Sequence, residues 1–173
     1  MGPQEMKQDP NGYAFHEALW VGFMAGGAGS GHHWWWDSVI DPMNLYTQYV
    51  PFAKFVSDIP VNKEPFPPAY TIIMPDNLRC YARQASWGLI AWVVNRDNAW
   101  RQIVQEKKPV ETVSGAQLIV PQLPIDGYHI TFFDTRTGET IEELTTTIEG
   151  MRQPIILPDF KVDIAIKILR VSR

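Results

Sequence analysis

The sequence has little cysteine, no long hydrophobic run and no excess of positive charge. Cys80 is the only cysteine among 173 residues, so the chain closes no internal disulfide and offers no cysteine pair to a structural zinc. No stretch approaches the roughly 18 apolar residues of a membrane span, and we expect no membrane partner. Fifteen Lys and Arg against 19 Asp and Glu give a net charge of −4, which argues against a nucleic-acid partner.

The composition is that of a folded chain. It is 45% hydrophobic and 20% charged, which excludes wholesale disorder. Its length allows one domain or two small ones. The first eight residues are polar and lack the apolar core of a secretory signal, so these residues leave the localisation open.

The amino-acid composition changes near the middle of the sequence. Residues 1–62 are rich in Trp, Gly and Ala, and residues 70–173 are rich in Val, Ile and Thr. Between them, residues 63–69 contain three prolines, which favour a stiff extended linker. We therefore expect an α+β, mostly β fold: a helix-strand-helix segment, a linker and a β-rich domain.

The first part predicts a helix, a strand and a second helix. Small residues at positions 14, 18, 22 and 25 share one helical face, which would let the helix approach a sheet closely. Residues 30–37 are short, aromatic and bounded by glycine, and predict a buried strand. Asp41 and Pro42 favour a second helix start, and Pro51 is expected to kink or divide that helix.

The second part predicts an antiparallel β-sandwich. Ile164, Ile166 and Ile168 alternate with other residues and should face one way. Turn signals separate the expected strands, as in short-stranded sandwiches. The expected strands are 70–74, 78–83, 88–94, 116–120, 127–134, 139–148, 153–157 and 162–171.

Tryptophan provides the candidate binding residues. On a strand, Trp34 and Trp36 would share one face and Asp37 the other. A flat indole suits the apolar face of a sugar ring, although large aromatics more often fill a core. Trp92 lies in an apolar run and is expected in the core, whereas Trp100 lies in a polar loop and is expected to be exposed.

The chain offers weak catalytic candidates. Glycoside hydrolysis needs two carboxyl groups at a defined separation, and no such pair can be identified from the sequence. Asp37 and Glu5 are the weak candidates. His32 and His33 would point apart on a strand, and no phosphate-binding or dinucleotide fingerprint is present, so we expect no metal and no cofactor.

Several motifs in order resemble the end of a cellulase-like (β/α)8 glycoside hydrolase and the small β-sandwich that follows such barrels. The first set resembles helix seven, strand eight and helix eight of the barrel, and the second set resembles the sandwich. The motifs are FHEALW (15–20), AGGAGSG (25–31), WWWD (34–37) and IDPMNLY (40–46), then GYHI (127–130), FDTRTGE (133–139), PDF (158–160) and DIA (163–165).

The resemblance implies a sugar site without its catalytic machinery. In such hydrolases the acid/base Glu follows strand four and the nucleophile Glu follows strand seven, and Glu5 is a poor remnant of the second. Strand eight supplies an aromatic platform, which would be Trp36 first and Trp34 second, with Asp37 beside them. The resemblance suggests an extracellular or periplasmic protein that meets a polysaccharide or oligosaccharide.

Three functions therefore compete. The chain is expected to be the C-terminal portion of a glycoside hydrolase for plant-type β-linked polysaccharide, inactive alone and self-associating through its open barrel segment. The alternatives are a carbohydrate-binding module that uses exposed Trp, and one subunit of a split hydrolase. Since one strand and two helices cannot close a barrel, the segment should dock on its own sandwich, self-associate as a homo-oligomer, or bind a missing N-terminal barrel chain.

Overall fold

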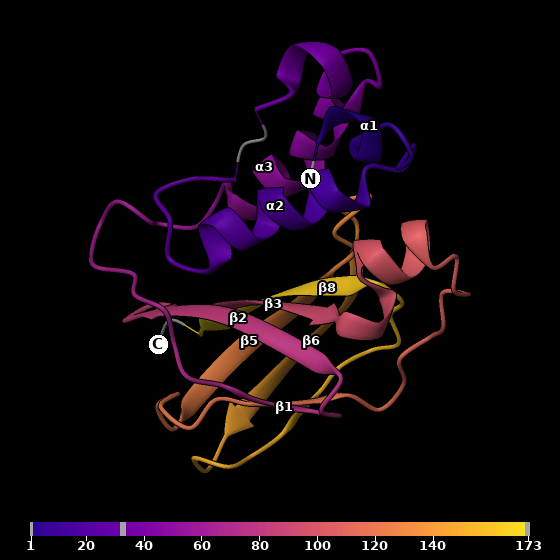
Figure 1. Ribbon diagram of the computed structural model, residues 1–173. Coiled ribbons are helices and arrows are strands. Elements are labelled where there is room, and N and C mark those ends of the chain that lie inside the picture. The colour runs from indigo at the N-terminus through magenta and orange to yellow at the C-terminus, as the bar shows by residue number, and fades with distance from the viewer. Residues whose placement is uncertain (1, 32–33, 172–173) are drawn as a thin grey trace.

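The computed structural model describes residues 2–31 and 34–171, which form a helical layer on a two-sheet β-structure (Figure 1). None of the helices in this described part is long and apolar enough to cross a bilayer. The helical elements are α1 (Pro3–Met6), α2 (Tyr13–Met24), the π-helix η1 (Trp36–Ile40), the 3-10 helix η2 (Leu45–Gln48), α3 (Tyr49–Val56), the 3-10 helix η3 (Arg96–Asn98) and the π-helix η4 (Arg101–Gln105).

Antiparallel strands form the two sheets, which confirms the mostly β fold. A five-stranded sheet has the order β2-β3-β8-β5-β6, and a three-stranded sheet has the order β1-β4-β7. All eight expected strands are present, with ends shifted by a few residues. They are β1 (Ile72–Met74), β2 (Leu78–Ala85), β3 (Gly88–Asn95), β4 (Gln117–Ile119), β5 (Asp126–Phe133), β6 (Thr140–Ile148), β7 (Ile155–Ile156) and β8 (Asp163–Arg170).

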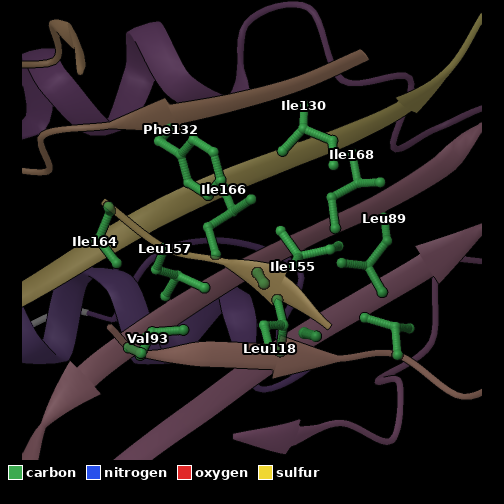
Figure 2. Close-up of a cluster of buried hydrophobic side chains, with 14 of the residues drawn as sticks. Leu89, Val93, Leu118, Ile130, Phe132, Ile155, Leu157, Ile164, Ile166 and Ile168 are labelled. Carbon is green, nitrogen blue, oxygen red and sulfur yellow. The ribbon is translucent and has the colours of Figure 1, made fainter. Parts of the chain in front are cut away.

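A hydrophobic core lies between the two sheets (Figure 2). Ile164, Ile166 and Ile168 of the central strand β8 point into it together, as their alternation predicts. Leu118 of β4 and Ile155 of β7 close it from the smaller sheet. This core forms because alternate residues of each strand point to the same face of its sheet, and those that point between the sheets are apolar.

The opposite face of the five-stranded sheet carries the helices (Figure 1). Trp92 of β3 is buried there, which confirms its predicted core position, and it stacks on Trp20 of α2 with ring centroids 6.4 Å apart. Phe52 and Phe55 of α3 pack against the same Trp20 ring. The helical segment therefore docks on the chain's own sandwich, and the expected self-association stays a prediction.

The predicted strand at 30–37 is wrong. Residues 32 and 33 lie outside the described residues, and the chain from Trp36 to Ile40 forms η1 instead. A lone strand here would leave its backbone groups without a ladder. The helical turn satisfies them locally, since the Asp41 amide donates to the Trp36 carbonyl at 2.9 Å, and it buries Val39 and Ile40 completely.

The second helix also differs from its prediction. It begins at Tyr49 and not at Asp41, because Asn44 adopts a left-handed conformation (φ 52°) between the two. The helical stretch around Pro51 is divided, since the 3-10 helix η2 ends at Gln48 and α3 begins at Tyr49. The proline lies in the first turn of α3, where a helix has no partner for the missing amide.

The face of α2 that carries the small residues contacts the segment that follows the helix, and not a sheet. A Cβ atom added to Gly22 would lie 2.1 Å from the Gly31 backbone nitrogen, and one added to Gly31 would lie 2.0 Å from the Ala18 carbonyl oxygen. The larger residues of α2 contact the sheet instead. The glycines therefore set the path by which the chain reaches Trp34.

Gly22→Ala is expected to lower the free energy of unfolding by about 1–3 kcal/mol, because the new methyl group must displace backbone atoms. In an uncrowded helix a change of Gly to Ala raises the free energy of unfolding by roughly 1 kcal/mol. The sign of the measured change therefore tells whether Gly22 is crowded. Gly29→Ala is the control, since a Cβ atom there meets nothing within 4 Å. Urea denaturation of the three proteins checks this, and a stabilised Gly22→Ala would contradict the contact.

Candidate functional site

Two tryptophans are left in solvent on the segment that joins α2 to α3. Trp34 is 81% exposed and Trp36 is 55% exposed. Val39 and Ile40, both fully buried, hold the end of the same turn against the protein. A large exposed aromatic surface on an anchored turn is typical of an interaction site.

The two carboxylate candidates lie on neighbouring elements but have different surroundings. α1, which carries Glu5, packs against η1, which carries Asp37. The Glu5 carboxylate accepts a hydrogen bond from the Gly2 amide at 2.8 Å, so it caps α1. Asp37 is exposed in the first turn of η1, one residue after Trp36. The assignment of Asp37 to substrate binding stays a prediction.

Trp100 is not the exposed loop residue that the sequence predicts. The helices η3 and η4 fold this loop onto α2, and the Trp100 ring is half-buried beside Ala14, Ala18 and Val21. Its indole nitrogen is fully buried. A polar loop sequence does not reveal this packing, because the partner helix lies about 80 positions earlier. Its assignment to substrate binding stays a prediction.

A buried polar cluster, which the sequence analysis missed, fastens α2 to the sheet. His16 is 2% exposed and Asp163 is 8% exposed, and His16 Nε2 lies 2.8 Å from Asp163 Oδ2. Trp92 Nε1 donates to the same oxygen at 3.0 Å, and the Thr135 hydroxyl donates to Asp163 Oδ1. One carboxylate therefore joins four segments of the chain.

The environment of Asp163 favours its charged form. Burial alone would raise its pKa, but the contact with His16, the hydroxyl of Thr135 and the charge of Arg136 together hold the pKa below its usual value. Asp163 Oδ1 accepts from Thr135 and Oδ2 accepts from Trp92, so the carboxylate ties the helical layer and the sheet together through its contact with His16.

A polar cleft of about 570 Å³ opens beside this cluster, between α2 and the edge strand β2. Glu17, Arg79, Tyr81, Arg96 and Asp97 are among its lining residues. Partial burial raises the pKa of Glu17, and the nearby negative charge of Asp163 raises it further. The cleft carries charges of both signs and lies on the sheet side of α2.

Residues for metal or thiol chemistry are not gathered in the described part of the chain. It contains no group of three His, Cys, Asp or Glu side chains that would hold a metal ion. His32 and His33 lie outside the described residues. Burial raises the pKa of the Cys80 thiol to about 12, so it stays protonated and is a poor nucleophile.

Comparison with known proteins yields a weak likeness to one hydrolase. No protein-family profile and no curated protein matches the chain. Two solved structures are similar to it: Gan42B, a GH42 beta-galactosidase, and a catalytic mutant of Gan42B from G. stearothermophilus. In each, the identity is 13%, the TM-score is 0.23, and the match covers 76% of this chain and 13% of that chain. The chain spans only a small part of the length of those proteins.

Proposed function

We propose that this chain is the C-terminal portion of a glycoside hydrolase that acts on plant-type β-linked polysaccharide, and that it binds saccharide without cleaving it alone. The exposure of Trp34 and Trp36 within the WWWD motif carries this proposal. The order of the sequence motifs supports the family, and the exposed pair supports the sugar site.

The two exposed indoles indicate a saccharide-binding site and not side chains exposed without a role. Burying one large apolar side chain contributes roughly 1.5–3 kcal/mol, so a fold that leaves two tryptophans in water forgoes a large stabilisation. An indole offers a flat apolar face to the C–H groups of a pyranose, and its N–H donates to a hydroxyl. Asp37, exposed beside Trp36, supplies an acceptor for further hydroxyl groups.

The carboxylates support binding and not hydrolysis. A glycosidase needs a general acid and a second carboxylate across the scissile bond. Glu5 is engaged in the cap of α1, which leaves Asp37 to act alone. One exposed carboxylate orients a sugar but does not complete the reaction, so the pure chain should release no reducing sugar.

Affinity gel electrophoresis in soluble β-glucan and galactomannan tests the proposal. The wild-type chain should be retarded in at least one gel, and the double variant Trp34→Ala, Trp36→Ala should lose the retardation. Tyr70→Ala is the matched control, because Tyr70 is an exposed aromatic (62%) outside this segment, and it should migrate as the wild type does. A wild-type chain that no glycan retards, or release of sugar by the pure chain, would refute the proposal.

A second candidate is assembly through the same segment. Four large hydrophobic residues are exposed between positions 34 and 50, namely Trp34, Trp36, Tyr46 and Val50. Such a patch suits a second copy or an N-terminal barrel chain. A monomer by light scattering would exclude the homo-oligomer. Activity that appears only after an N-terminal barrel chain is added would instead indicate a split hydrolase.

A further inference from the structure

A small cavity lies at the junction of α2, β8 and the loops after β3 and β5. His16, Trp92, Trp100, Arg136 and Asp163 are among the residues that line it. The volume open to the centre of a water molecule in this cavity is about 10 Å³. That is about the volume needed for one ordered water, and it is too small for a saccharide or a buffer anion such as phosphate.

Three residues that line this cavity each carry a buried polar atom without a hydrogen-bond partner among the described residues. These atoms are His16 Nδ1, Trp100 Nε1 and Arg136 Nη2. Each would cost about 1–3 kcal/mol if it stayed unsatisfied. The coincidence of three such residues around one water-sized space is the observation that carries the inference.

The chemistry of each group limits its hydrogen-bonding role. Trp100 Nε1 and Arg136 Nη2 carry protons and only donate. Since the carboxylate of Asp163 only accepts, His16 Nε2 holds the proton of their 2.8 Å contact. With the His16 ring in its neutral form, which the proposal below includes, Nδ1 is an acceptor. Two donors and one acceptor are the complement of a single water molecule.

We propose that this cavity is a site for one buried structural water, which accepts from Trp100 and Arg136 and donates to His16. Arg136 is held in place for this role, since its Nη1 donates to the Asn11 carbonyl at 3.0 Å and its guanidinium lies 4.7 Å from the Tyr13 ring. The water thus joins the loop after β3, the β5–β6 turn and α2. It also selects the Nε2–H tautomer of His16.

A high-resolution crystal structure of the full chain tests the site directly. One density peak within hydrogen-bonding distance of all three atoms is expected. A dry cavity would overturn the proposal, and so would an anomalous peak there after a bromide soak, since that would indicate a halide site.

Nitrogen NMR of His16 gives a second readout that simple packing does not affect. Nε2 should be protonated and Nδ1 unprotonated, and a protonated Nδ1 would overturn the proposal. Trp100→Phe removes one donor to the water and should shift the Nδ1 resonance. Trp87→Phe is the control, because Trp87 Nε1 is also buried and unpartnered but its residue does not line this cavity. An Nδ1 resonance that responds equally to both changes would count against the water.

Discussion

Asp163→Ala is expected to lower the free energy of unfolding by about 3–5 kcal/mol, the cost of removing one partner from a buried ionic cluster. The change leaves His16 Nε2, Trp92 Nε1 and the Thr135 hydroxyl without the carboxylate that accepts from each of them. Urea denaturation, followed by tryptophan fluorescence, measures the loss. Because a domain of this size is stable by only about 5–15 kcal/mol, the loss is a large fraction of the total.

Asp159→Ala is the control for this variant. Asp159 is an exposed carboxylate four positions earlier, and its removal should change the stability by no more than about 0.5 kcal/mol. Equal effects of the two changes would show that Asp163 acts through general charge and not through its buried contacts.

The pH dependence of the free energy of unfolding should reflect the protonation of the same carboxylate. Because the folded-state pKa of Asp163 lies below the unfolded value, its contribution is present above about pH 4 and is lost as the pH falls through the folded-state pKa. Asp163→Asn removes that contribution, so its stability should fall less steeply below about pH 4 than that of the wild type. Parallel profiles would contradict the depressed pKa.

Trp20→Ala is expected to cost about 3–5 kcal/mol, as for other fully buried aromatic side chains. Trp20 is 1% exposed and contacts Phe52 and Phe55 of α3 as well as Trp92 of the sheet. Its removal opens a cavity where the two helices and the sheet meet. Chemical denaturation gives the magnitude, and near-ultraviolet circular dichroism reports the loss of aromatic packing.

Trp36→Ala is the matched control, because it removes the same side chain from a position that is 55% exposed. It should leave stability nearly unchanged, which also shows that a binding defect in this variant is not a folding defect. A small effect of Trp20→Ala would contradict the docking of the helices on the sheet.

Short-range patterns account for what could be predicted. Alternation in β8 predicts that Ile164, Ile166 and Ile168 share a face, because a strand turns successive side chains to opposite sides. The tryptophan run offers no such pattern, since three identical residues fit a strand and a helix equally well. The buried Val39 and Ile40, and not the tryptophans, decide the π-helix there.

The candidate site could be predicted only in part. The sequence identifies Trp34, Trp36 and Asp37 as a group, since they are neighbours in the chain. Their exposure depends on which other residues cover them, and sequence alone favours burial for Trp. The His16–Asp163 contact joins residues 147 positions apart, and no local pattern signals such a contact.

The amino-acid pattern alone specifies the eight strands, their turns, the buried Trp92 and the tryptophan motif, because each depends on neighbours a few positions away. Folding of the whole chain decides the rest. It determines that α2 and α3 cover the sheet, that Trp100 turns its indole nitrogen inward, and that a single carboxylate ties four segments together. These features depend on burial and on hydrogen bonds between distant segments, and only a packed structure brings those groups into contact.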